Sequence, residues 1–125
     1  MVAGVGTDLM EIARIGQSIA RFGDRFLARV FTPDEIAYCQ RKKSAAESFA
    51  ARFAAKEAGA KALGTGISQG ISWLELEVTR ERSGKPGLRL SGRAAERARS
   101  LGVTRISLSI THSRDTALAV VIMET

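Results

Sequence analysis

Two acidic side chains, Asp8 and Glu57, stand at positions where a carboxylate is unexpected or could bind a cation. At about 100° per residue, Glu57 falls on the same side of a predicted helix as Phe49 and Phe53. Asp8 follows a short strand-like segment, residues 2–7, and precedes a helical pattern. An ionised carboxylate on an apolar side is costly unless it is paired or binds a cation. Because Mg²⁺ is commonly held by one or two carboxylates with substrate phosphates and water, one hypothesis is that Asp8 and Glu57 share a magnesium ion.

Each carboxylate also has a simpler structural explanation. Lys61 lies one helical turn after Glu57, in the order that favours an intrahelical ion pair. Asp8 stands at the expected boundary between a strand and a helix, where Asp is a common N-cap. The residue types alone leave these explanations open.

Cationic side chains accompany Glu57 on the same predicted helix. Arg52 and Lys56 share one side of it, whereas Lys61 points elsewhere. The helix ends at Gly64, and with Gly66 this residue forms a loop that could bring backbone amides near an anion. A glycine-rich helix end is common, so this indication of phosphate binding is weak by itself. The sequence contains neither a Walker-type nor a dinucleotide-binding glycine pattern.

The single histidine and a set of arginines each have a structural and a functional interpretation. His112, the only histidine, shares a face of a predicted strand with Leu108 and Ile110, which favours a packed core histidine. Several arginines fall close to one stripe if their segments are helical, and the simpler interpretation of such a stripe is a solvated basic face. These arginines are Arg14, Arg21, Arg25 and Arg29. Gly16 and Gly23 argue against one unbroken helix there.

The elements that must position these residues form a mixed pattern. Helices are predicted at residues 33–41, 45–63 and 92–101 and in the segment after Asp8, and strands at 2–7, 73–79, 87–90, 103–111 and 116–123. Residues 83–86 (SGKP) are typical of a turn. The order predicts an α+β fold with an antiparallel sheet packed against helices, in a single domain over residues 1–125.

Composition narrows the function further. The 125 residues carry a net charge of +6, which favours anionic partners such as phosphate-rich ligands, acidic proteins or nucleic acid. The single cysteine, Cys39, excludes an internal disulfide and a cysteine-based metal site. The sequence shows neither a signal-peptide pattern nor an apolar run of membrane-spanning length. We therefore expect a cytoplasmic protein without membrane contact.

Residues 5–14 (VGTDLMEIAR) and 52–64 (RFAAKEAGAKALG), together with 109–113 (SITHS), resemble the holo-acyl-carrier-protein synthases, the small type of 4′-phosphopantetheinyl transferase. The resemblance covers essentially the whole chain, and the second motif is the specific one. It implies transfer of the 4′-phosphopantetheine group of coenzyme A to a serine of an apo acyl carrier protein in fatty-acid or polyketide biosynthesis, with release of 3′,5′-ADP. The small trimeric fold of that family is expected with it.

The same resemblance assigns roles to individual residues. Asp8 and Glu57 correspond to the ligands of a Mg²⁺ ion that bridges the pyrophosphate of coenzyme A, and Lys61 to the lysine beside that pyrophosphate; these three are the expected catalytic residues. The proton acceptor is either Glu57 or a metal-bound water. The implied coenzyme A contacts are Arg52, Lys56, Lys61, Gly64, Gly66, Ser83, Gly84, Lys85, Pro86, His112 and Ser113. Family members commonly have Asn where this chain has Ser83.

The resemblance also implies protein partners. Arg14, Arg21 and Arg25 are expected to receive an acidic helix of the carrier protein. A homotrimer with the active site between subunits is expected as well. The apolar run at residues 117–123 suits a strand buried on both faces, although an internal helix would cover it equally well.

Two other classes of protein compete with this interpretation. A small basic nucleic-acid-binding module would explain the charge, but aromatic residues make up only 6% of the chain, and Asp8 and Glu57 would have no role. An inactive scaffold subunit would retain the fold, but it would not need the two carboxylates together with Lys61.

Overall fold

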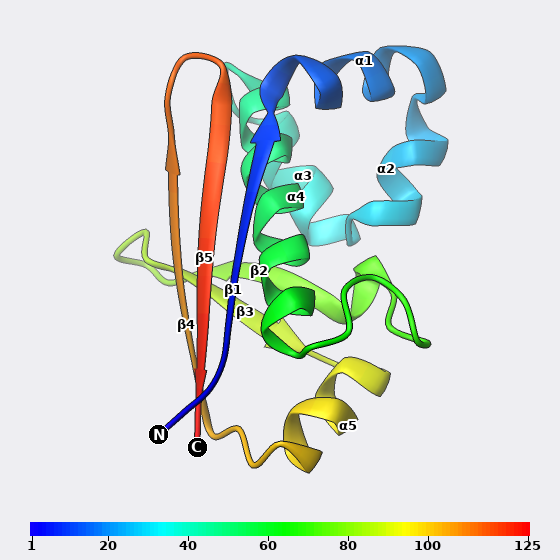
Figure 1. Cartoon of the computed structure of the whole chain (residues 1–125). Coiled ribbons are helices and arrows are strands. Elements are labelled where there is room, and N and C mark those ends of the chain that lie inside the picture. The colour runs from blue at the N-terminus through cyan, green and yellow to red at the C-terminus, as the bar shows by residue number, and fades with distance from the viewer.

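A three-stranded antiparallel sheet in the order β1-β5-β4 supports the fold (Figure 1). The computed structural model describes all of residues 1–125. Strand β1 is Val2–Glu11, β4 is Arg105–His112 and β5 is Thr116–Glu124. The C-terminal hairpin β4–β5 was predicted within two residues at each end. The α+β class with an antiparallel sheet is confirmed.

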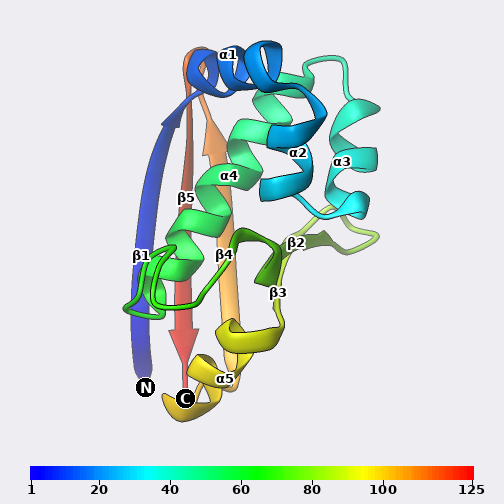
Figure 2. The ribbon, with the colours of Figure 1, turned by 90° about the vertical axis from the view of Figure 1, so that its right-hand side faces the viewer.

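Helix α4 (Ala45–Ala62) crosses one face of this sheet, as Figure 2 shows. Its alanines are buried on nearly every side, so strands and helices can both pack closely against it. The helix was predicted at residues 45–63, and it ends as expected before Gly64, whose φ of +81° only glycine adopts readily. The longest helix is therefore the centre of the core, with the sheet on one side and the helices of residues 12–40 on the other.

Two glycines in β1 allow its backbone to touch the backbone of α4. A Cβ atom on Gly4 would overlap the carbonyl oxygen of Ala62, and one on Gly6 would overlap that of Ala58. Because side chains alternate along a strand, Asp8 faces α4 as these glycines do. The close approach thus brings the Asp8 carboxylate to the surface of α4.

No helix covers the opposite face of the sheet (Figure 1). In β5 the alternate residues Ala117, Ala119, Val121 and Met123 are buried, while those between them are half-exposed. Within one chain the run at 117–123 is therefore buried on one face only. The open face continues onto β1 through Val5 and Leu9, which are 56% and 62% exposed.

Three short helices follow β1 and pack against the N-terminal half of α4. They are α1 (Ile12–Phe22), α2 (Asp24–Val30) and α3 (Pro33–Gln40). The break between the first two falls at Gly23, with a φ of +57°. Helix α3 begins as predicted, since the Thr32 hydroxyl accepts from the Glu35 amide and the Glu35 carboxylate accepts from the Thr32 amide.

The central segment departs from the predicted strand at 73–79. Residues Trp73–Glu75 form a 3₁₀ turn, and strand β2 is only Leu76–Arg80. The alternation of side chains suggested a longer strand, but the Glu75 carboxylate accepts from the Ser72 amide and starts a helical turn. Strand β2 pairs with β3 (Pro86–Leu90) in a separate two-stranded sheet, and α5 (Gly92–Ser100) follows as predicted. No helix in the structure has the length and apolarity needed to cross a membrane.

Candidate active site

Asp8 lies inside β1 and does not cap a helix. The expected strand end at residue 7 was wrong, because β1 continues to Glu11, and α1 begins at Ile12 without a side-chain cap. The Asp8 carboxylate is largely buried, and its Oδ2 atom is inaccessible and has no hydrogen-bond partner. A buried carboxylate oxygen without a partner is costly, which marks this position as one where a ligand would be stabilising.

Glu57 is half-buried on α4 and close enough to Asp8 for their charges to interact. Burial raises the pKa of Glu57 above its ordinary value of 4.5, and the negative charge of Asp8 raises this pKa further. Lys61 opposes both effects but does not cancel them. A cation bound beside two partly buried carboxylates would relieve the repulsion between them.

These donor groups fit a magnesium ion that also takes substrate oxygens. Asp8 and Glu57 supply two carboxylates, and no group of three or more acidic, histidine or cysteine ligands exists anywhere in the chain. Two protein carboxylates suit Mg²⁺, which keeps several waters and binds phosphates. They do not make a complete cage of protein ligands. The orphan Oδ2 atom of Asp8 offers one free coordinating oxygen.

Lys61 contacts Asp8 across the gap between α4 and β1. Its Nζ atom lies 3.1 Å from Asp8 Oδ1 and donates to the Thr7 carbonyl oxygen at 3.0 Å. The intrahelical ion pair between Glu57 and Lys61, one of the two interpretations left open by the sequence, does not form. Because the lysine side chain remains half-exposed, its ammonium group is available to an anion that approaches the two carboxylates.

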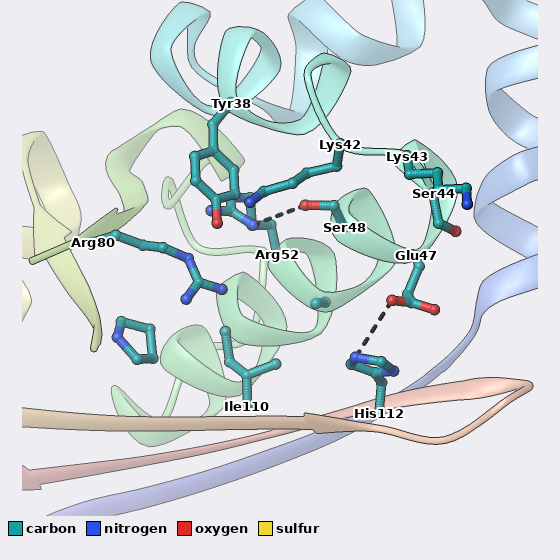
Figure 3. A pocket seen from close by; sticks show the side chains of 12 residues that line it. Tyr38, Lys42, Lys43, Ser44, Glu47, Ser48, Arg52, Arg80, Ile110 and His112 are labelled. Atoms are coloured by element: carbon teal, nitrogen blue, oxygen red, sulfur yellow. Dashed lines mark hydrogen bonds and ion pairs between the residues drawn. The ribbon is translucent and has the colours of Figure 1, made fainter. Parts of the chain in front are cut away.

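A basic pocket of about 540 Å³ lies near the start of α4 (Figure 3). Four cationic side chains line it: Lys42, Lys43, Arg52 and Arg80. His112 also lines it, at the end of β4, and is half-exposed with its Nε2 atom 3.3 Å from Glu47 Oε1. The simpler expectation of a packed core histidine is therefore wrong, because His112 lies beyond the last buried residue on its strand face. This accumulation of positive charge suits a phosphorylated ligand.

The basic pocket and the carboxylate pair belong to different sides of the molecule. Arg52 and Glu57 are five residues apart on α4, which separates their side chains by about 140° around the helix axis. The pocket uses β4 and the carboxylate site uses β1, and these strands form opposite edges of the sheet with β5 between them. One chain therefore does not direct both groups at the same small region.

Lys56 is a buried structural residue and not a phosphate ligand in this arrangement. Its Nζ atom lies 2.6 Å from Glu35 Oε1, and both side chains are fully buried. It also donates to the carbonyl oxygens of Trp73 and Leu76. Burial lowers the pKa of Lys56, although the Glu35 carboxylate raises it in part. All three ammonium donors have partners, so we correct the expected coenzyme A contact at this residue.

The glycine and turn residues expected to contact coenzyme A lie in three different parts of the structure. Gly64 and Gly66 lie after the C-terminus of α4, at the end that carries Lys61, and both have positive φ. Ser83, Gly84 and Lys85 form the exposed turn between β2 and β3, and of that motif only Pro86 lines the basic pocket. Ser113 belongs to the β4–β5 turn, where its hydroxyl lies 3.0 Å from Thr116 Oγ1.

Comparison with known proteins gives the family. A sequence profile of the 4′-phosphopantetheinyl transferase superfamily matches residues 4–121. The chain belongs to this superfamily. It is 53% identical over 124 residues to the holo-[acyl-carrier-protein] synthase of Koribacter versatilis, and the match covers 99% of each chain.

Solved structures of holo-[acyl-carrier-protein] synthases share the fold. The Neisseria meningitidis protein superposes with a TM-score of 0.91 at 35% identity, over the whole of both chains. The Helicobacter pylori protein, solved in complex with coenzyme A, superposes with a TM-score of 0.85 at 35% identity, over 96% of this chain and 99% of that one. The resemblance inferred from the two motifs is confirmed.

A second surface of this phosphopantetheinyl transferase contains the predicted docking arginines. Arg14 and Arg21 on α1 line a groove of about 270 Å³, which Met10 and Phe53 also line. Arg25 lines an adjoining hollow of about 560 Å³ beside the exposed Phe22. Met10 lies two residues after Asp8, and Phe53 lies one helical turn before Glu57. The groove therefore leads toward the carboxylates.

Several pocket residues of this transferase were not selected from its sequence. Lys42 and Lys43 were visible as a basic pair before the predicted helix at residue 45, and that pair was the available signal. Tyr38, Glu47 and Arg80 gave no local signal, because only the packing of α3, α4 and β2 brings them together.

Proposed function

We propose that this protein is a holo-[acyl-carrier-protein] synthase. It transfers the 4′-phosphopantetheine group of coenzyme A to a serine of an apo acyl carrier protein and releases 3′,5′-ADP. The observation that carries the proposal is the pair of converging carboxylates, Asp8 and Glu57, with Lys61 beside them, in a chain that matches the superfamily over residues 4–121. The rival nucleic-acid module explains none of these features.

Asp8 and Glu57 would hold a Mg²⁺ ion together with oxygens of the pyrophosphate. Such an ion supplies charge neutralisation on the phosphoryl oxygens, which dominates catalysis in phosphoryl transfer. The orphan buried oxygen of Asp8 and the repulsion that raises the Glu57 pKa support this assignment. A Mg²⁺ requirement is therefore part of the proposal.

Besides holding the metal, the protein side chains have two tasks in the reaction. The serine hydroxyl attacks the β-phosphorus of coenzyme A, and the bond from this phosphorus to the leaving 3′,5′-ADP breaks. Either Glu57 or a water bound to the metal that it would hold takes the serine proton. Lys61 offsets the charge that develops on the pyrophosphate oxygens. Its half-exposed ammonium can leave Asp8 Oδ1 for this contact.

The basic pocket would take the nucleotide end of coenzyme A. Lys42, Lys43, Arg52 and Arg80 provide positive charge around a volume sufficient for a nucleoside phosphate, and His112 lines the same pocket. Pro86 reaches this pocket from the turn motif, as the family resemblance implies. Gly64 and Gly66 would lie near the pyrophosphate, at the end of α4 that carries Lys61.

A homotrimer would combine the two parts of the site. The carboxylate pair and the basic pocket occupy opposite sheet edges, so a ligand that spans both is best accommodated between two subunits. The uncovered face of β1 and β5, with exposed Val5 and Leu9, supplies an apolar surface for assembly. Closed cyclic symmetry then gives three equivalent sites.

The arginine-lined groove on α1 and α2 would receive the carrier protein. Arg14 and Arg21 flank apolar side chains, and this combination suits an acidic amphipathic helix. Arg25 extends the positive surface. The groove leads toward Asp8 and Glu57, where the carrier serine must arrive.

We place this reaction in the cytoplasm and in one domain over residues 1–125. The single buried thiol of Cys39 suits a reducing compartment.

The test is intact-mass spectrometry of apo carrier proteins incubated with the protein, coenzyme A and Mg²⁺. We expect a mass gain of one phosphopantetheine group that is absent with EDTA and with the Asp8→Ala and Glu57→Ala variants. The control variant Glu96→Ala, which removes an exposed acid from α5, should retain activity. Failure to modify several different apo carriers would contradict the proposed function.

A further inference from the structure

Tyr38 occupies a wall of the basic pocket, and no role described so far uses it. It is the only tyrosine in the chain, and it points from α3 toward Arg52 and Arg80 (Figure 3). These three residues also line a second hollow of about 350 Å³. Tyr38 therefore stands in the partition between two cavities, where it contacts groups from several elements.

Three cations of the basic pocket gather on the ring of Tyr38. The guanidinium carbon of Arg52 lies 4.0 Å from the ring centroid, Lys42 Nζ lies 4.6 Å from it, and the guanidinium carbon of Arg80 lies 5.4 Å from it. They come from α4, from the segment after α3 and from β2. A cation within about 6 Å of an aromatic face is attracted to the negative ring face. None of the three forms an ion pair with a carboxylate.

Arg52 has few other partners in this position. The residue is 2% exposed, and its Nε atom is buried without a hydrogen-bond partner. One terminal nitrogen donates to Ser48 Oγ at 3.2 Å. A buried cation without a counter-ion is unfavourable unless an anion compensates it. The ring of Tyr38 stabilises this cation while leaving its charge available to the pocket.

We propose that Tyr38 is a positioning residue of the basic pocket: its ring holds Arg52, Lys42 and Arg80 together in one wall that binds a phosphate monoester. Tyr38 acts through these cations and need not touch the ligand. The inference rests on the proposed function, in which this pocket receives the nucleotide end of coenzyme A. It extends that function because it assigns to Tyr38, an uncharged residue, the task of holding the phosphate-binding cations in place before the ligand arrives.

The hydroxyl group of Tyr38 gives a measurable consequence. Burial by itself would raise the pKa of Tyr38, but the positive side chains of Lys42, Arg80 and Arg52 outweigh burial, and this pKa lies below its ordinary value of 10.0. A bound phosphate would neutralise these cations, so the pKa of Tyr38 should rise when ligand binds.

Nearby acids do not account for this lowering, because a negative charge raises a tyrosine pKa. Glu35 is paired with Lys56, and Glu77 with Arg89. Asp34 lines the second hollow and remains exposed. Arg41 is the fourth cation over the Tyr38 ring, with its guanidinium carbon 5.9 Å from the ring centroid.

The first test compares Tyr38→Phe, which keeps the ring, with Tyr38→Leu, which removes it. Calorimetric titration of the whole protein with 3′,5′-ADP should give a dissociation constant within about twofold of wild type for the Phe variant and about tenfold weaker for the Leu variant. In the transfer reaction, Tyr38→Leu should raise KM for coenzyme A while leaving kcat and the carrier KM unchanged. Wild-type affinity in the Leu variant, or equal losses in both variants, would overturn the proposal.

The second test follows the ultraviolet absorbance of tyrosinate without ligand. Tyr38 is the only tyrosine, so its ionisation is read directly. Lys42→Gln and Arg80→Gln should each raise its pKa, whereas Arg99→Gln, which removes an exposed arginine from α5, should not. If the pKa of Tyr38 were unchanged in both Lys42→Gln and Arg80→Gln, these cations would not lie close to Tyr38 and the proposal would be refuted.

The two tests also separate this inference from the proposed function. If wild-type protein fails to bind 3′,5′-ADP, the nucleotide assignment fails, and the same tyrosinate titration is repeated with inorganic phosphate. A rise in the Tyr38 pKa with phosphate that disappears in Lys42→Gln would support the anion-binding wall without coenzyme A. No change with phosphate would overturn it.

Discussion

At the residue scale, the chemistry of this protein depends on which partner each charged side chain finds. Lys56 and Lys61 lie on one helix, yet Lys56 is fully buried against Glu35 and Lys61 is half-exposed beside Asp8. Glu57 lies next to Lys56 in sequence and faces Asp8. Glu57 and Lys61, one and five positions after Lys56 on α4, thus belong to the candidate catalytic groups, whereas Lys56 belongs to a structural ion pair.

Glu57→Gln should stabilise the metal-free protein while abolishing its activity. In the unfolded chain this carboxyl has its ordinary pKa of 4.5, and in the folded chain the pKa is higher. The native state therefore binds the proton more tightly, and its stability falls as pH rises through the interval between the two pKa values. Glutamine mimics the protonated form. We expect a higher Tm for Glu57→Gln at neutral pH and no difference below pH 4.5.

Thermal melts between pH 4 and 8 in EDTA measure the stability effect, and the mass assay should show activity reduced by about a hundredfold or more. A lower Tm for the variant at neutral pH would show that the Glu57 carboxylate is stabilised in the fold, contrary to its raised pKa.

The two lysines of α4 should respond differently to substitution. Lys56→Met leaves the buried Glu35 carboxylate without its counter-ion, so we expect a loss of about 3–5 kcal/mol in the free energy of unfolding. Lys61→Met removes a half-exposed contact and should change stability by less than about 1 kcal/mol, while transfer slows strongly. Urea unfolding and the mass assay measure the two effects. Equal destabilisation by both substitutions would contradict this division of roles.

At the element scale, the position of the site depends on how closely β1 approaches α4. Gly4 and Gly6 have no side chains between the two backbones, so Asp8, the next residue on that face, reaches the helix surface. The same approach lets Lys61 Nζ contact the Thr7 carbonyl oxygen at 3.0 Å. The convergence of Asp8 and Lys61 is thus a consequence of strand–helix packing.

Gly6→Ala should separate β1 from α4 and weaken the site. The added methyl group would overlap the backbone carbonyl of Ala58, which cannot rotate away. We expect a loss of about 1–3 kcal/mol or more in stability, together with weaker Mg²⁺ binding by calorimetry. Gly16→Ala is the matched control. Its methyl group would lie in ordinary contact with Ala46 Cβ at 3.7 Å, inside a helix where alanine is favoured by about 0.5–1 kcal/mol. Similar behaviour of the two variants would contradict the close-approach explanation.

At the scale of the whole molecule, the basic pocket and the carboxylate pair face different directions. One chain therefore does not direct both of them at the same ligand. The basic pocket is at the β4 edge of the sheet and the carboxylates are at the β1 edge. The uncovered sheet face provides the surface on which copies of the chain could pack. Assembly would therefore complete the active site as well as cover apolar area.

Mixed oligomers test this arrangement. Glu57→Gln inactivates the carboxylate half, and Lys42→Glu places a negative charge in the basic pocket. Each variant alone should be inactive, but subunits mixed in equal amounts should regain activity, because about a quarter of the shared sites would combine two intact halves. Val5→Asp, on the open face, should give monomers by light scattering and abolish this rescue. Two assembled variants that never complement one another would place each active site within a single chain.

The sequence by itself determined the features that depend on residues close together in the chain. The capping box at Thr32, the helix over residues 45–63 and its end at Gly64 follow from local hydrogen bonding and backbone preferences. The motifs at 5–14 and 52–64 predicted the superfamily, and the comparisons confirm it. The roles assigned to individual site residues stay predictions until the variants are measured.

Tertiary structure decided what depends on distant partners. Periodicity could not show that β1 continues through Asp8, because pairing with β5 extends the strand. Nor could it show that Lys56 would form a buried ion pair with Glu35 or that Lys61 would contact Asp8. Helical spacing gives the direction of a side chain but not the group that meets it there. The charge state, accessibility and chemistry of each residue depend on that group, and only the packing of separate elements supplies it.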